Sequence, residues 1–173
     1  MSTGLSVGLL LLRVGLAVLL AGHACQKLFG WFRGLGPSGH GAIFDQWGFR
    51  PGRDMAILAG VCELVGAASL ALGLLMPGGC AVVIGTMLVA ATPNARNGLW
   101  AHLGGSEVPV VYAGLGVVLA LTGPGRFSLD RAFGLQALRD IGWSVAAIAV
   151  GALAAVPPLA RRRAALRRTP TPT

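Results

Sequence analysis

The sequence is poor in charged residues. Only 12% of its 173 residues are charged, and six are acidic, whereas 54% are hydrophobic. A soluble domain carries about 25% charged residues, because its surface has to be hydrated. With half that density, lipid has to be the solvent for most of the surface. We therefore predict an integral membrane protein without a substantial soluble domain.

Motifs of redox and cofactor chemistry are also lacking. Cys25, Cys62 and Cys80 stand alone, which excludes a C-x-x-C redox pair. Three scattered histidines form no metal or haem motif, and no phosphate-binding glycine loop is present. There is no flavin motif either. The sequence therefore predicts no metal, haem or flavin site.

The net charge of +8 does not indicate nucleic-acid binding. Five arginines directly follow an apolar run, and most of the others lie between such runs; the five are Arg161, Arg162, Arg163, Arg167 and Arg168. This pattern is typical of basic segments beside anionic lipid. We expect membrane lipid, and not nucleic acid, as the partner of these residues.

Five apolar stretches predict membrane-spanning helices. They run from about Leu5 to Phe29, Met55 to Met76, Cys80 to Thr92, Val108 to Leu121 and Ile141 to Leu159. A helix that is apolar on all sides is typical of immersion in lipid, where backbone groups must be bonded internally. Pro77-Gly78-Gly79 predicts a tight turn between the second and third stretches. After the first stretch, Ile43, Phe44 and Trp47 stand at helical spacing and predict a short interfacial helix.

Glycines recur inside the spans. Gly8, Gly15 and Gly22 stand seven residues apart in the first stretch, and Gly60 and Gly66 lie in the second. Small side chains let membrane helices approach closely. The spacing predicts tight helix packing along both stretches.

The predicted fold is an all-α membrane protein. Residues 1–131 are expected to form a four-helix transmembrane bundle with the short interfacial helix, residues 132–160 an additional fifth helix, and residues 161–173 a basic, flexible tail. With five crossings, ten lysines and arginines lie on the side of the tail and three on the other side. Since positive residues favour the cytoplasmic side, the tail is expected to be cytoplasmic, in a multi-pass protein of the inner membrane.

Charged and polar residues inside the spans are the candidates for chemistry, because a charge at a span's centre costs about 2.5–3.5 kcal/mol. Arg13 and Glu63 are expected to face each other, either to fix helix register or to form a polar pocket for a head group or a proton. His23 and Lys27, four residues apart, share a helix face with Arg13. They either bind a quinone carbonyl or relay a proton, or else they anchor the helix at the interface.

A second group of candidates lies in the connections. Asn97, Trp100 and Glu107 lie between the third and fourth stretches, and Trp31 follows the first. We interpret them as ligand-binding residues. The alternative is that they are solvated loop residues and aromatic anchors of the membrane interface.

Several segments together resemble the DoxX family of small bacterial and archaeal membrane proteins. They occur over about residues 8–131, in the family's order, and are Leu12-Arg13-Val14-Gly15-Leu16, residues 23–32, 58–66 and 72–75, Asn97-Gly98, Glu107-Val108-Pro109 and residues 123–130. The resemblance implies a four-helix core and a link to membrane oxidoreductase systems that use quinones or sulfur compounds. One position departs from the family, because Asn94 stands where a histidine is expected.

Two functions are consistent with these observations. The first is a subunit or small enzyme that binds a quinone or another lipophilic isoprenoid in the bundle, with Glu63, Arg13, His23 and Lys27 as catalytic candidates. Its electrons would come from a partner or a substrate. The second is a non-catalytic scaffold that recruits a soluble redox enzyme through the basic tail. A soluble redox protein or a second copy of the chain is the expected protein partner.

Overall fold

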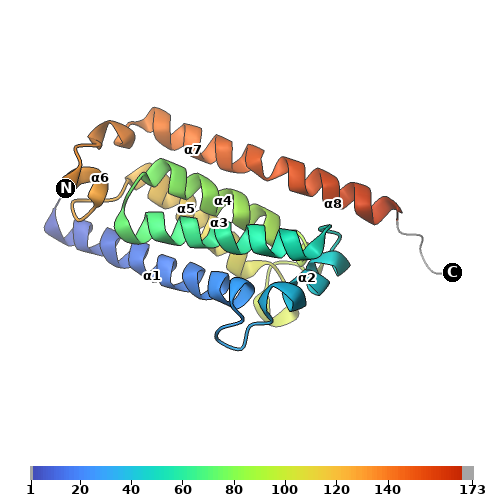
Figure 1. The fold of residues 1–173 in the computed structure, drawn as a ribbon. Helices are drawn as coiled ribbons and strands as arrows, with labels where there is room; N and C mark the ends of the chain where they lie inside the picture. The colour runs from blue at the N-terminus through green and yellow to red at the C-terminus, as the bar shows by residue number, and fades with distance from the viewer. Residues whose placement is uncertain (1, 169–173) are drawn as a thin grey trace.

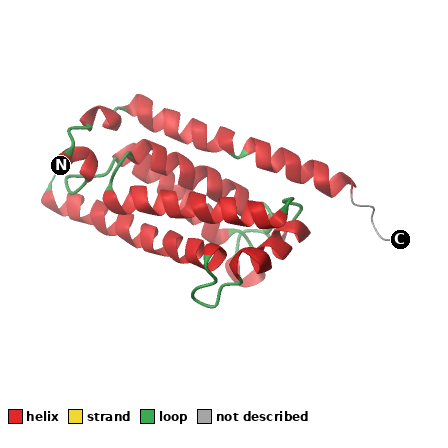
Figure 2. Cartoon of the chain, in the orientation of Figure 1, coloured by secondary structure: helices red, strands yellow, loops and turns green. Residues whose placement is uncertain are grey.

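The computed structural model describes residues 2–168, which form helices joined by short connections (Figures 1 and 2). The long helices are α1 (Thr3–Leu28), α3 (Gly52–Leu72), α4 (Met76–Ala91), α5 (Glu107–Thr122) and α7 (Ile141–Ala154), which α8 (Val156–Arg168) continues. The short ones are α2 (Gly36–Gln46), α6 (Leu129–Ala132) and the 3-10 turns η1 (Ala95–Asn97), η2 (Ala101–Leu103) and η3 (Gln136–Arg139). No strand occurs within residues 2–168, and the predicted all-α fold is confirmed.

Four helices form a ring. α1 packs on α3, α3 on α4, and α4 on α5, which returns to α1. α7 lies outside this ring, against α4 and α5 (Figure 1). A Cβ on Gly85 would lie 2.8 Å from the Gly151 oxygen, and a Cβ on Gly151 would lie 2.7 Å from the Ala81 oxygen. Close contact between the backbones of α4 and α7 therefore holds the additional helix to the bundle.

The helices have the length and surface of membrane spans. α1, α3 and the continuous α7–α8 rod are long and apolar enough to cross a membrane, and α4 and α5 are shorter apolar helices. Large apolar side chains are exposed on several of these helices, among them Leu11, Val18, Val65, Val111 and Leu153. Lipid solvates such a surface, whereas water does not. The chain is a multi-pass membrane protein.

The packed core fills one half of the ring. It contains the starts of α1 and α4 and the ends of α3 and α5, and includes Leu9, Leu16, Leu20, Leu70, Met76, Val83 and Leu119. In the other half, α2 packs on α3 and on the end of α1. That half holds the cavity described below.

The turn between α3 and α4 differs from the prediction. α3 ends at Leu72, Gly73 has a left-handed φ of 61°, and α4 begins at Met76. Pro77 therefore lies in the first turn of α4 and not in the connection. Proline suits a first helical turn, where its missing N–H has no intrahelical partner to lose. Glycine suits the residue after a helix, because it adopts φ > 0 without a steric penalty.

The C-terminal helix extends further than predicted. α8 runs to Arg168, so residues 161–168 are helical and the predicted boundary at residue 161 falls inside a helix. The segment from Arg161 to Arg168 contains only arginine, alanine and leucine, which are strong helix formers. The predicted flexible tail otherwise concerns residues 169–173, which lie outside the described residues.

The predicted glycine packing holds for α3 but not for α1. No atom lies within 4 Å of a Cβ built on Gly8, Gly15 or Gly22, apart from the helix's own backbone. On α3, a Cβ at Gly60 would lie 2.8 Å from Leu28 Cγ. The sevenfold spacing places the α1 glycines on one face, but that face is not the one that packs against α3.

Candidate functional site

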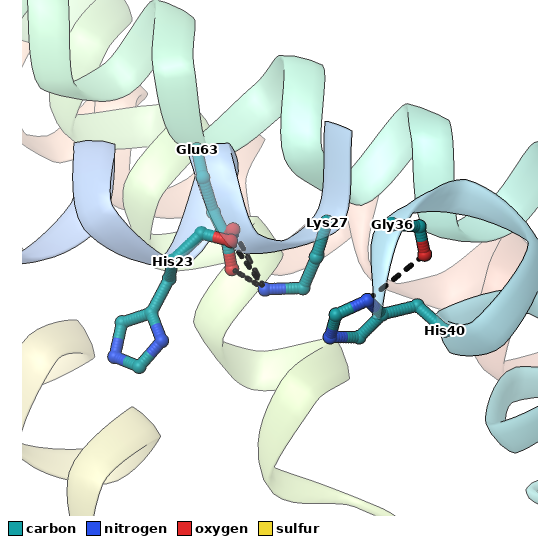
Figure 3. Close-up of polar contacts among 5 residues, drawn as sticks. All are labelled: His23, Lys27, Gly36, His40 and Glu63. Carbon is teal, nitrogen blue, oxygen red and sulfur yellow. Dashed lines mark hydrogen bonds and ion pairs between the residues drawn. The ribbon is translucent and has the colours of Figure 1, made fainter. Parts of the chain in front are cut away.

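Lys27 and Glu63 form an ion pair between α1 and α3 (Figure 3). Lys27 Nζ lies 2.9 Å from Glu63 Oε1 and 2.8 Å from Oε2. The lysine side chain is 15% exposed and the glutamate 5%. Since taking a single charge out of water is costly, each of these groups needs the other as its counter-ion.

Arg13 does not face Glu63, and the predicted Arg13–Glu63 pair is wrong. α1 and α3 run in opposite directions, and Lys27 lies beside Gly60 and Glu63. Arg13 precedes Lys27 by fourteen residues, or about 21 Å of helix. It therefore lies beside Gly73, at the far end of α3. The register of two antiparallel helices, that is, which residue of one lies beside which residue of the other, decides which charges can pair. The positions of the polar residues in the sequence do not give this register.

Arg13 belongs to a second polar cluster, at the opposite end of the bundle. The guanidinium is fully buried, and Nη2 donates to the Phe127 carbonyl oxygen. The Asp130 carboxylate is also buried and acts on Arg13 electrostatically. It accepts hydrogen bonds from the backbone N–H of Leu75 (2.7 Å) and Met76 (3.1 Å). This cluster ties the α5–α6 connection to α1 and to the α3–α4 turn, and lies outside the cavity.

A cavity of about 440 Å³ adjoins the Lys27–Glu63 pair. It lies between α1, α2, α3 and α4, and Ala154 of α7 and Pro158 of α8 form part of its wall. Most lining residues are apolar. The polar ones are His23, Gln26, Lys27, His40, Cys62, Glu63 and Thr86. An apolar cavity of roughly 300–1,000 Å³ with a few polar groups is typical of small-molecule sites.

Two imidazole rings lie on either side of Lys27 in the view of Figure 3. His40 Nδ1 is 3.0 Å from the Gly36 carbonyl oxygen. Because a carbonyl only accepts, Nδ1 carries the hydrogen, and Nε2 of the neutral ring is an acceptor. The His23 ring has no hydrogen bond within residues 2–168 and lies 6.2 Å from the Tyr112 ring, centre to centre. Each histidine thus has a ring nitrogen available to a ligand.

The loop candidates lie outside the cavity lining. Asn97 Nδ2 donates to the Gly104 oxygen at 3.1 Å, and a Glu107 oxygen accepts from the Ala101 N–H at 2.8 Å. Both side chains therefore shape the connection between α4 and α5. The Trp31 and Trp100 side chains are exposed. Contact of these four residues with a ligand stays a prediction.

Sequence reasoning missed four polar residues of the cavity, namely Gln26, His40, Cys62 and Thr86. A signal existed for His40, which precedes Phe44 by four residues and Trp47 by seven. This spacing places all three on one face of the interfacial helix. Within residues 2–168, no group of three or more histidine, cysteine or acidic side chains is arranged to hold a metal ion.

Comparison with known protein families matches residues 8–103 to DoxX. The chain belongs to the DoxX family. The matched region runs from α1 to η2 and includes His23, Lys27 and Glu63. Of the residues that line the cavity of this DoxX protein, Ala154 and Pro158 alone lie beyond the match. No curated protein and no solved structure matches the chain.

Proposed function

We propose that this DoxX protein binds a lipophilic molecule of the quinone or isoprenoid type in the cavity between α1 and α4. The observation that carries the proposal is the Lys27–Glu63 pair in the wall of an otherwise largely apolar cavity. A quinone combines carbonyl oxygens, which accept hydrogen bonds, with an apolar tail. The cavity offers matching donors and an apolar lining.

The polar residues have distinct roles in this proposal. His23 donates a hydrogen bond to the head group, and Lys27 donates another in place of its long contact with the His23 carbonyl oxygen (3.5 Å), while Glu63 holds the Lys27 side chain in position. Apolar residues of α3 and α4 such as Leu58 and Val82 contact the tail. Reduction of a quinone takes two electrons and two protons. His23 is suited to deliver a proton from its ring N–H, and His40 to take up a proton on Nε2 and then pass it on, while the electrons come from a redox partner.

Filling the cavity should expel its ligand. Ala59 lines the cavity and is half-buried, whereas Ala68, also on α3, is exposed. We expect Ala59→Leu to lower ligand content roughly tenfold or more, since overpacking costs about 1–3 kcal/mol. Ala68→Leu is the matched control and should retain the ligand. The measurement is mass spectrometry of lipid extracts from protein purified in mild detergent from its native membrane.

Two outcomes would contradict the proposal. One is a wild-type protein that carries no stoichiometric lipophilic molecule. The other is a molecule that Ala59→Leu retains as fully as Ala68→Leu does. An empty wild-type cavity, together with a co-purifying soluble oxidoreductase, would instead favour the scaffold function.

We also infer that α8 ends in the cytoplasm. The end of the bundle at which α8 terminates carries Lys27, Arg33, Arg50, Arg53, Arg96 and the five arginines of α8, whereas the opposite loops carry Arg126, Arg131 and Arg139 (Figure 1). Positive residues favour the cytoplasmic side of an inner membrane. A C-terminal green fluorescent protein fusion should fluoresce and an alkaline phosphatase fusion should be inactive. The opposite pair of results would reverse the orientation.

A further inference from the structure

Arg162 of α8 is fixed against the connection between α2 and α3. Its Nε donates to the Trp47 carbonyl oxygen at 2.8 Å, and its guanidinium carbon lies 5.5 Å from the centre of the Phe49 ring. One turn further along, Leu166 packs beside Gly48, where a Cβ would lie 2.9 Å from Leu166 Cγ. These contacts hold the basic part of α8 in a defined place on the bundle.

Two other arginines lie near this anchored side chain. Arg96 follows α4 in η1, Arg163 is the next residue of α8, and the positive charges of both act on Arg162. The side chains of Arg96 and Arg163 are exposed. Within residues 2–168, none of the three arginines forms an ion pair with an acidic side chain. The charges of Arg96 and Arg163 repel that of the anchored Arg162, and an anion among the three side chains would offset this repulsion.

The arginines lie at the depth of lipid head groups. Arg162 follows Ile141, where α7 begins, by twenty-one residues. At 1.5 Å per residue this is about 32 Å, close to the roughly 30 Å thickness of the hydrocarbon core. Trp47, whose side chain is partly exposed, lies at the same level, because its backbone carbonyl oxygen accepts from Arg162. Tryptophans are typical of this interfacial zone.

We propose that Arg96, Arg162 and Arg163 bind the phosphate of an anionic phospholipid. Guanidinium groups bind phosphate oxygens through paired N–H donors, and charge-assisted bonds of this kind are strong. The acyl chains extend from this depth along the lipid-facing surface of α7, where Val150 and Leu153 are exposed. A bilayer lipid is favoured over a soluble anion because the cluster lies beside such an apolar surface. Arg162 contacts Trp47 and Phe49 of the cavity wall, but none of the three arginines lines the cavity, so the lipid site does not depend on what the cavity binds.

The proposal is tested with the full-length protein in detergent and native mass spectrometry. We expect phosphatidylglycerol to bind more tightly than phosphatidylcholine. The double variant Arg96→Gln/Arg163→Gln should weaken phosphatidylglycerol binding about tenfold or more. Arg162 stays unchanged, because it also packs on Phe49 and Trp47. The control, Arg167→Gln/Arg168→Gln, removes the same charge from the end of α8 and should change binding less than about threefold.

Several results would overturn the site. Equal losses in the two double variants would mean diffuse attraction to all the arginines. Equal binding of phosphatidylcholine would mean that the negative charge is not recognised. Inorganic phosphate that binds as tightly as the lipid would make the ligand a free anion. Unchanged lipid binding in the Arg96→Gln/Arg163→Gln variant, with loss of a co-purifying soluble protein, would make this surface a protein-docking site.

Discussion

Lys27→Met is expected to lower the free energy of unfolding by about 3–5 kcal/mol, because it leaves a buried charge without its partner. Glu63 is 5% exposed, and both its carboxylate oxygens accept from Lys27. In the folded variant the Glu63 carboxylate is either left unpaired or becomes protonated. Both changes destabilise the folded state. Thermal and denaturant unfolding in detergent, followed by circular dichroism, measures the loss.

A second variant separates stability from ligand binding. Lys27→Met/Glu63→Leu removes both charges and should regain most of the stability, since apolar replacements of buried ion pairs are often neutral or stabilising. It should still lose the cavity ligand, because the polar contacts are gone. Arg53→Met, at an exposed position on α3, is the control and should change stability by less than about 0.5 kcal/mol. A Lys27→Met protein as stable as the wild type would contradict the buried pair.

Asp130→Ala should have a comparable effect, about 3–5 kcal/mol, through a different mechanism. Asp130 is 2% exposed, and its two oxygens accept from the N–H groups of Leu75 and Met76 at the start of α4. The same carboxylate is the neighbouring negative charge for the fully buried Arg13. Its removal leaves two backbone donors and one guanidinium uncompensated. The midpoint of thermal unfolding in detergent reports the loss.

Asp140→Ala is the matched control for this experiment. Asp140 also caps a helix, since it accepts from the Gly142 N–H at 2.8 Å, but this contact is exposed and no buried arginine depends on it. Loss of such a cap costs about 1 kcal/mol. Equal destabilisation by the two substitutions would show that Asp130 acts only as a helix cap.

Hydrophobicity was sufficient to predict the helices, but not which residues meet. The five apolar stretches and the helix around Phe44 were found from the sequence, because lipid immersion requires long apolar segments. The partner of Glu63 was not, since a charge on α3 can pair with any inward-facing residue of α1. In the antiparallel register of α1 and α3, Lys27 lies beside Glu63, and Arg13 lies beside Gly73. Register depends on side-chain packing along the whole interface, and no single residue encodes it.

The role of the Gly123–Asp130 segment also depends on the fold. The sequence marks Asp130 as part of a family-like motif, but not as the residue that caps α4. Its hydrogen bonds reach residues 55 and 54 positions earlier in the chain. His40 and Thr86 likewise become cavity residues only when α2 and α4 border the same space. Such contacts join segments that are far apart in the sequence, so they can be identified only once the helices are placed in the bundle.

The unequal lengths of the spans affect the surrounding bilayer. α5 has 16 residues, a rise of about 24 Å, whereas the 26 residues of α1 rise about 39 Å. Lipid beside α5 therefore meets a hydrophobic surface thinner than an average bilayer, and lipid beside α1 meets a thicker one. Such mismatch deforms the membrane or tilts the protein at a cost of fractions of a kcal/mol per Å. The bundle should therefore thin the bilayer beside α5, and thicken it beside α1 or tilt so that α1 fits.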